Sequence, residues 1–93
     1  MILSYRSKSL KRFWQKNDAT GIRPDWVNRV RLVLSLLDKA ARPEDANVPG
    51  LNFHALTGDQ SGRFSLLVSR NWRITFAWQD IDAIGVDLED YHG

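Results

Sequence analysis

The hydrophobic residues change their spacing near the middle of the chain, and this change limits the folds that the chain can adopt. Between Pro24 and Arg42, apolar residues recur at the three- and four-residue spacing of a helix with one buried face. They are Val27, Val30, Val33, Leu34, Leu37 and Ala41. From Leu51 onward, apolar and polar residues alternate, as in strands with one buried face. The first part is therefore expected to be helical and the second part to form a sheet.

The first forty residues are expected to hold a short strand and two helices. Residues 2–5 are apolar at their start and are predicted to form a strand. After it, Ser7 or Ser9 can cap a helix. Its apolar face comprises Leu10, Phe13 and Trp14. The second helix can begin at Pro24, and it ends by Pro43, because proline lacks an amide donor and disfavours helical geometry in the preceding residue.

Four further strands are expected after a loop over residues 44–50. The alternating segments are 52–56, 64–69, 72–78 and 84–89. The last three are joined by short connections, so they predict an antiparallel meander to which the strand 52–56 can pair. The order is β-α-α-β-β-β-β, an α+β fold with a twisted, mainly antiparallel sheet and two N-terminal helices on one face. A chain of 93 residues with 43 % hydrophobic content supports one domain over 1–93.

Several classes of protein are disfavoured by what the sequence lacks. It has no cysteine, which excludes disulfides and thiolate zinc sites. It has no Gly-rich phosphate loop, no histidine pair at metal-binding helical spacing and no nucleophile elbow, so no metal or cofactor is expected. Charged residues follow Tyr5 at once, and no apolar run reaches membrane-spanning length. A cytoplasmic protein without membrane contact is therefore expected.

The charge is distributed unevenly along the chain. Residues 1–31 hold eight lysines and arginines but only two aspartates, whereas the remaining 62 residues hold five basic and nine acidic side chains. The first helix carries four of the basic residues, Lys8, Lys11, Arg12 and Lys16. Such a face can bind a polyanion such as RNA, or it can be the solvated side of an amphipathic helix.

The candidate acid–base groups lie near the ends of strands. The two histidines are His54 and His92, and Asp90 and Tyr91 directly precede the second. Histidine titrates near neutral pH, and RNA supplies its own nucleophile in the 2′-hydroxyl, so a ribonuclease needs only proton transfer and phosphate binding. Here Asp90 can act as a base or orient a histidine, His54 or His92 can carry protons, and Tyr91 can stack on a base. Arg73 can hold the phosphate. Without further context, a solvated tail and a structural histidine explain the same residues.

The sequence resembles the HigB branch of the RelE superfamily of toxins. The resemblance covers nearly the whole chain and rests on the opening strand and basic helix and on three later segments. These segments are Leu51–Gly58, Asn71–Phe76 (Asn-Trp-Arg-Ile-Thr-Phe) and Asp87–His92, which ends in Asp-Tyr-His. The resemblance implies a RelE-like fold, a twisted antiparallel sheet with two helices on one side, in agreement with the order derived from periodicity.

The resemblance also implies a toxin that cleaves messenger RNA in the ribosomal A site and thereby inhibits translation. The residues implicated by motif position are His54, Arg73, Asp90, Tyr91 and His92. The basic first helix would face ribosomal RNA. A cognate antitoxin, a HigA-like helix-turn-helix protein, would neutralise the toxin, which would contact DNA only indirectly through that partner.

One departure from the family pattern affects the expected site. The family's usual His-Pro-Leu-Lys-Gly-Asp is replaced by His54-Ala-Leu-Thr57-Gly-Asp59, so a lysine that could neutralise phosphate is missing. Arg63 or Arg70 can substitute for it. In addition, Gly93 follows His92, so the histidine does not carry the terminal carboxylate.

Two alternatives to a ribonuclease share the same fold. One is a non-catalytic binding toxin, like the gyrase-poisoning ParE relatives, since a fold alone does not determine activity. The other is a degenerate relative that binds its antitoxin but has lost activity through changes such as Thr57. The acid–base residues favour the enzyme over the binding toxin.

Overall fold

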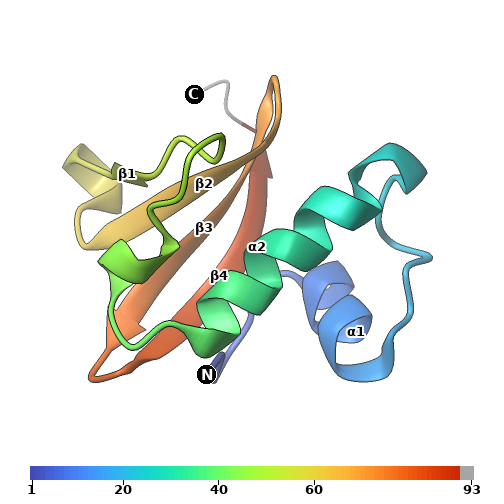
Figure 1. The fold of residues 1–93 in the computed structure, drawn as a ribbon, viewed down its shortest axis with the longest axis horizontal. Helices are drawn as coiled ribbons and strands as arrows, with labels where there is room; N and C mark the ends of the chain where they lie inside the picture. The colour runs from blue at the N-terminus through green and yellow to red at the C-terminus, as the bar shows by residue number, and fades with distance from the viewer. Residues whose placement is uncertain (91–93) are drawn as a thin grey trace.

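The computed structural model describes residues 1–90. Two α-helices come first, α1 over Lys8–Lys16 and α2 over Val27–Lys39. Four strands follow, β1 over His54–Ala55, β2 over Arg63–Ser69, β3 over Trp72–Gln79 and β4 over Asp82–Asp90. They form one sheet in the order β1-β2-β3-β4, in which all neighbours are antiparallel (Figure 1). The predicted α+β meander is confirmed.

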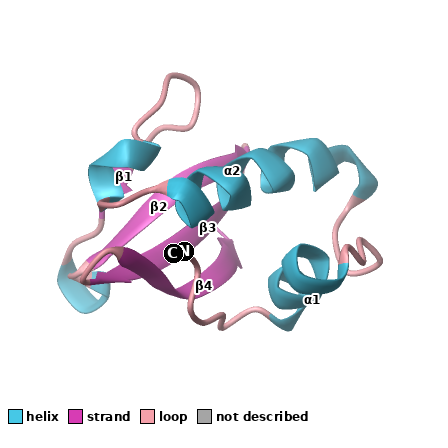
Figure 2. Cartoon of the chain, turned by 60° about the horizontal axis from the view of Figure 1, so that its bottom comes forward, coloured by secondary structure: helices cyan, strands magenta, loops and turns pink. Residues whose placement is uncertain are grey.

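Helix α2 crosses one face of the sheet, and α1 lies beside β4 (Figure 2). The residues of α2 that face the sheet are spaced as predicted and are fully buried: Val30, Val33, Leu34 and Leu37. The sheet meets them with Leu66, Ile74, Phe76 and Val86, all 0 % exposed. Helix α1 adds Leu10 and Phe13 to the same core. Burial of these side chains is the main favourable contribution to folding, at about 1.5–3 kcal/mol for each large aliphatic or aromatic group.

The predicted strand over residues 2–5 is wrong as a continuous strand. The segment makes two isolated parallel bridges to β4, Ile2 with Ala83 and Tyr5 with Val86. Between these bridges, Gly85 has a positive φ of 58°, and the β3–β4 register shifts opposite it. The amide of Gly85 donates to the side-chain oxygen of Ser4 at 2.8 Å. This local bulge interrupts the ladder, so regular strand pairing does not form.

Both helices begin and end close to the predicted positions. The Ser7 side chain accepts from the Leu10 amide and caps α1, and Asn17, with φ 53°, ends it in the left-handed conformation. Pro24 opens a 3₁₀ turn over Pro24–Trp26 that leads into α2. Helix α2 stops at Lys39, since Ala40 is already extended. The predicted continuation of the apolar stripe to residue 41 is therefore wrong.

The strand expected over residues 52–56 is shorter than predicted. Only His54–Ala55 pair as a strand, because Asn52 adopts a left-handed conformation with φ 50°. The Leu56 amide still donates to the Arg63 carbonyl at 2.8 Å, which holds the following loop to β2. That loop contains a 3₁₀ turn, η3, over Gly58–Gln60. In the part of the chain that the structure describes, no helix is long and apolar enough to cross a membrane.

Candidate active site

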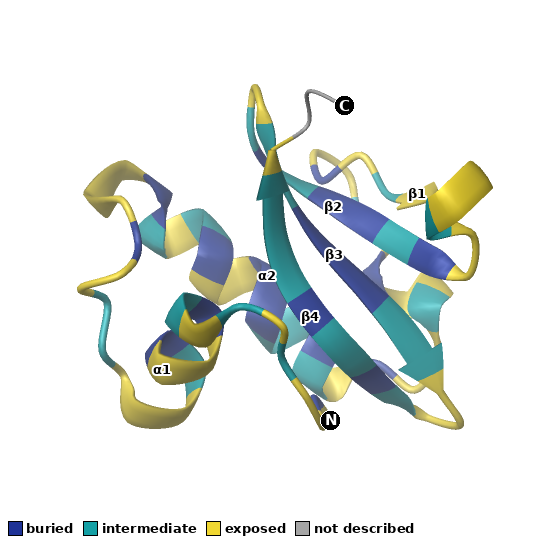
Figure 3. Cartoon of the chain, turned by 180° about the vertical axis from the view of Figure 1, so that it is seen from behind, coloured by how far each residue is buried: buried dark blue, intermediate teal, exposed yellow. Residues whose placement is uncertain are grey.

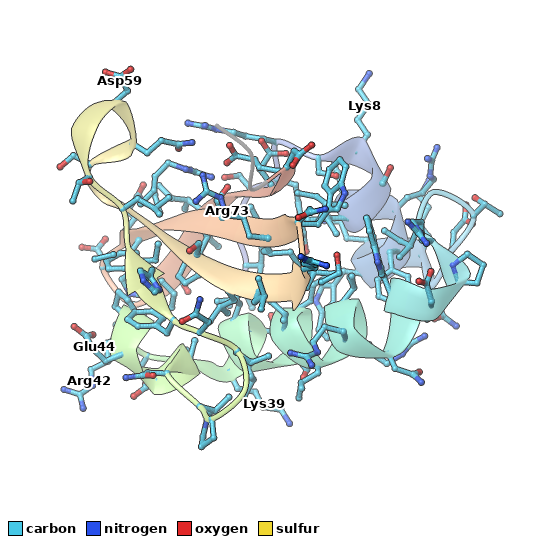
Figure 4. The ribbon with its side chains drawn as sticks, turned by 90° about the horizontal axis from the view of Figure 1, so that it is seen from above. Lys8, Lys39, Arg42, Glu44, Asp59 and Arg73 are labelled. Carbon is cyan, nitrogen blue, oxygen red and sulfur yellow. The ribbon has the colours of Figure 1, made fainter. Side chains whose placement is uncertain are left out.

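The sheet face opposite α2 carries two of the predicted site residues, His54 and Arg73. Directly opposed residues on neighbouring strands project to the same face. One row across the sheet comprises His54, Ser65, Thr75 and Asp87. Arg73 lies two residues from Thr75 on this face, and Figure 4 shows it pointing away from α2. The antiparallel register therefore places His54 and Arg73, which are distant in sequence, on one polar surface, which we call the open face.

His54 is exposed at the edge of this surface. Its Nδ1 lies 3.1 Å from the carbonyl oxygen of Asn52. A proton on Nδ1 makes this contact a hydrogen bond and leaves Nε2 as the acceptor that a general base requires. His54 and Arg73 are two strands and two residues apart, so their backbones are separated by about 12 Å.

Asp90 ends β4 at the same end of the sheet as the β2–β3 turn. It lies opposite Trp72 and therefore projects to the face that α2 covers, whereas its neighbour Glu89 lies opposite Arg73 on the open face. Asp90 is exposed, as is Arg70 in the turn between β2 and β3. Because Ser69, Trp72 and Asp90 are successive register partners, the turn and the strand end lie side by side. The predicted residues Tyr91 and His92 follow directly and lie outside the described residues.

A hydrogen-bonded network of polar side chains lies between these positions. The Arg63 Nη2 donates to the Thr75 hydroxyl at 2.9 Å and to the Gly85 carbonyl at 2.7 Å. The Thr75 hydroxyl in turn donates to Oε2 of Glu89, and Gln60 donates from Nε2 to Oε1 of the same carboxylate at 3.0 Å. Thr75 is fully buried, and Arg63 is 7 % exposed. The open face is therefore polar, but some of its side chains are shielded from solvent. Figure 3 shows that β2 and β3 are the strands with long buried segments.

The electrostatics of this network lower the pKa of both Glu89 and Arg63. Burial raises the pKa of Glu89, but hydrogen bonds from Thr75 and Gln60 and the charges of Arg73 and Arg63 outweigh it, and the net shift is downward. Burial lowers the pKa of the Arg63 guanidinium, and the nearby charge of Arg6 acts in the same direction, while Glu89 and Asp87 oppose both. Glu89 is thus an ionised carboxylate between arginines at neutral pH.

The buried position of Arg63 bears on its predicted role as a phosphate ligand. Its guanidinium donates to groups beneath the surface, to Thr75 and to Gly85. Arg70 is instead exposed at the sheet end beside Asp90. Of the two arginines that were expected to replace the missing lysine at Thr57, the geometry favours Arg70 for contact with a ligand and Arg63 for internal support.

The basic residues of α1 form a separate exposed surface. Lys8, Lys11, Arg12 and Lys16, with Gln15, line a shallow groove of about 190 Å³. The four basic side chains are exposed, and α1 contains no acidic residue. The Arg12 Nε lies 3.7 Å from Asp18, the one ion pair of this helix among residues 1–90. Figure 4 shows Lys8 extending on the side of the sheet to which Arg73 points. One end of the groove, at Lys8, thus lies on the same side of the sheet as the open face.

The expectation that the site binds no metal stays a prediction. Within residues 1–90, no group of three or more histidine, cysteine, aspartate or glutamate side chains is placed to hold a metal ion. The open face instead offers a histidine, arginines and carboxylates, which transfer protons and bind anions.

Comparison with known proteins places the chain in a family. The sequence model of the HigB-like toxin family, described as RelE-like toxins of type II toxin–antitoxin systems, matches residues 3–92. The chain belongs to this family. Toxins of this family are neutralised by antitoxins, so an antitoxin partner is implied for this HigB-like toxin as well.

Individual relatives agree with this placement over the full length. The endoribonuclease HigB of Proteus vulgaris is 36 % identical over 92 residues, which cover 99 % of this chain and 100 % of that protein. The toxin HigB-1 of Vibrio cholerae serotype O1 is 30 % identical over 93 residues, which cover 98 % of this chain and 94 % of that protein. These matches confirm the resemblance on which the sequence-based identification rested.

A solved structure supports the fold. The solution structure of the conserved hypothetical protein HP0894 from Helicobacter pylori aligns with a TM-score of 0.52 at 20 % identity, covering 98 % of this chain and 96 % of that one. At this identity the likeness concerns the fold alone, and it agrees with the RelE-like α+β architecture expected for a HigB-like toxin.

Sequence reasoning missed three polar residues of the open face, Gln60, Thr75 and Glu89. Thr75 and Glu89 occupy alternating strand positions that are typical of solvent-facing residues. Their hydrogen bonds join residues 14 and 29 positions apart, which only the strand register brings together. The sequence offered one indication that Glu89 belongs to the site. Glu89 directly precedes Asp90, and it lies in the predicted strand that pairs with the strand of Arg73.

Proposed function

We propose that this toxin is a ribosome-dependent endoribonuclease that cleaves messenger RNA in the ribosomal A site and so inhibits translation. Endoribonuclease activity follows from family membership together with the full-length similarity to the endoribonuclease HigB of Proteus vulgaris. The observation that carries the proposal is the open face, where His54 and Arg73 share one surface.

The proposed reaction uses the 2′-hydroxyl of the substrate as nucleophile. A general base takes its proton, the 2′-oxygen attacks the adjacent phosphorus, and the bond from phosphorus to the 5′-oxygen breaks. A general acid protonates the departing 5′-oxygen, and the product ends in a 2′,3′-cyclic phosphate. The substrate supplies both the nucleophile and the leaving group, so the protein needs only to transfer protons and to stabilise charge, which histidine, aspartate and arginine side chains can do.

The roles of the side chains follow from their chemistry and position. Arg73 would bind the scissile phosphate, because a guanidinium presents two parallel N–H donors to phosphate oxygens. His54 and Asp90 would transfer protons, together with His92, and Tyr91 would stack on a base. Arg70, exposed beside Asp90, would supply the positive charge that Thr57 lacks.

The basic groove of α1 would bind ribosomal RNA. Lys8, Lys11, Arg12 and Lys16 are exposed, and each contact with a phosphate releases counterions, so the interaction would weaken as salt rises. The ribosome would then present messenger RNA to the open face. The antitoxin is proposed to be a HigA-like helix-turn-helix protein, through which alone the toxin reaches DNA, and the site of action is the cytoplasm.

The test is cleavage of a defined messenger RNA by the purified toxin, with and without programmed ribosomes. We expect cuts within codons at the A site, only in the presence of ribosomes, and a 2′,3′-cyclic phosphate on the upstream fragment. Intact RNA in both conditions, from a folded toxin that still arrests growth, would refute the proposal and favour a non-catalytic binding toxin of the ParE kind.

A further inference from the structure

Glu89 connects the two sides of the open face. On β4 it lies opposite Arg73 and directly precedes Asp90. Its carboxylate accepts hydrogen bonds from Thr75 on β3 and from Gln60 in the turn η3, which follows the strand of His54. The Glu89 side chain thus contacts both β3, the strand that carries Arg73, and the loop that follows His54.

The bond from Gln60 reaches across the sheet. Gln60 precedes β2, whereas Glu89 lies on β4, so the bond spans β2 and β3 and joins positions 29 residues apart. The start of the same loop is held by the Leu56 amide on the Arg63 carbonyl. With both attachments in place, the loop that contains Thr57 and Gly58 is tied down on the open face.

The charge of Glu89 balances a group of arginines. Arg63, 7 % exposed, shares Thr75 as a hydrogen-bond partner with Glu89, and Arg73 and Arg63 both stabilise the Glu89 carboxylate electrostatically. Arg6 adds a third positive charge that acts on Arg63. Removing the carboxylate would leave these guanidinium groups to repel one another, and Arg73 would lose the charged group that faces it.

We propose that Glu89 is a positioning residue for RNA cleavage, whose carboxylate holds the Arg73 guanidinium and the loop after His54 in one fixed arrangement. This inference rests on the proposed function, since it assigns Glu89 a part in the same reaction. Glu89 acts through Arg73 and Gln60 and does not itself contact the phosphate, because like charges would repel.

The primary test compares Glu89→Gln with the wild-type toxin on programmed ribosomes. The substitution keeps the shape of the side chain but removes the charge and one acceptor. Misplacement of a catalytic group by about 1 Å can cost roughly 100-fold, so we expect kcat to fall about 10- to 100-fold, with a smaller change in KM. Glu44→Gln, at an exposed position on the α2 side, is the matched control and should cleave like the wild type (Figure 4).

Two further measurements separate positioning from loss of fold. The Nε–Hε resonance of Arg73, assigned by its absence in Arg73→Lys, should shift in Glu89→Gln and stay in place in Glu44→Gln. Gln60→Ala, which removes the donor without altering β4, should shift the same resonance and lower kcat in the same direction. The thermal midpoint of each variant reports whether the folded population is retained.

The outcomes distinguish this inference from the proposed function. Full activity and an unshifted Arg73 resonance in Glu89→Gln, with activity lost in Arg73→Ala and His54→Ala, would overturn the role of Glu89 and leave the site standing. Wild-type cleavage by Arg73→Ala and His54→Ala would refute the site itself. An unaltered Arg73 resonance in folded Gln60→Ala would refute the connection between the loop and Arg73.

Discussion

The two faces of the sheet are built from alternate residues of the same strands, yet different interactions hold their side chains in place. Beneath α2, apolar side chains such as Leu66, Ile74 and Phe76 are fully buried and need only fill space. On the open face, Thr75 is equally buried, but its hydroxyl has defined partners in Arg63 and Glu89. The covered face therefore determines stability through volume, and the open face arranges charged groups through directional bonds.

The largest expected effect on stability comes from the covered face. Leu34→Ala removes a fully buried side chain of α2 and leaves a cavity, so the free energy of unfolding should fall by about 2–5 kcal/mol. Chemical denaturation measures this loss. Cleavage per folded molecule should be unchanged, and a loss of less than about 1 kcal/mol would show that the core relaxes around the cavity.

On the open face, Thr75→Val should destabilise the fold less than Leu34→Ala does, but it should lower the cleavage rate more. Valine keeps the volume but leaves Arg63 and Glu89 without the buried hydroxyl, at a cost of about 1–3 kcal/mol in the free energy of unfolding. Thr75→Ser retains the hydroxyl and serves as the control. Equal stability and equal cleavage rates for the valine and serine variants would show that the hydrogen bonds of the Thr75 hydroxyl contribute neither to folding nor to cleavage.

The ionisation of Glu89 should contribute to the pH dependence of the free energy of unfolding. Its pKa is lowered in the folded state, so its contribution is complete above the ordinary glutamate value of 4.5 and is lost as pH falls through the lower folded value. Wild-type stability should therefore drop more steeply than that of Glu89→Gln below about pH 5. Parallel stability curves for the two proteins in that range would show that the carboxylate is not stabilised on folding.

The smallest effect on the fold should come from the basic groove of α1. The double variant Lys8→Gln, Lys11→Gln removes two exposed charges, so ribosome binding should weaken and its slope on logarithmic salt concentration should fall by about 1–2. Unfolding should be almost unaffected. Lys39→Gln, exposed on the α2 side, is the control, and an equal loss of ribosome binding in that variant would contradict a specific surface on α1 (Figure 4).

The covered face was largely predictable from the sequence, since its residues repeat with the periods of helix and strand. The α2 residues Val30, Val33, Leu34 and Leu37 were identified in this way, as was the antiparallel meander. The N-terminal strand was not predictable, because the bulge at Gly85 that interrupts it involves Ser4, a partner 81 residues away in the sequence.

The candidate site was predictable only for residues whose chemistry is distinctive. His54, Arg73 and Asp90 stand out by residue type and motif position, and the sheet register brings His54 and Arg73 to one face. Glu89 and Gln60 carry no such signal, because surface strands and turns contain these residue types routinely. Their importance arises from contacts, which periodicity does not encode.

The most direct test of the account is single-turnover cleavage of messenger RNA on programmed ribosomes by His54→Ala, Arg73→Ala and Asp90→Asn, with Glu44→Gln as control. The account predicts that Arg73→Ala loses about 100-fold or more in rate, that the other two site variants also lose most of their activity, and that all four variants remain folded. Wild-type rates in His54→Ala and Arg73→Ala would show that the open face is not where RNA is cleaved.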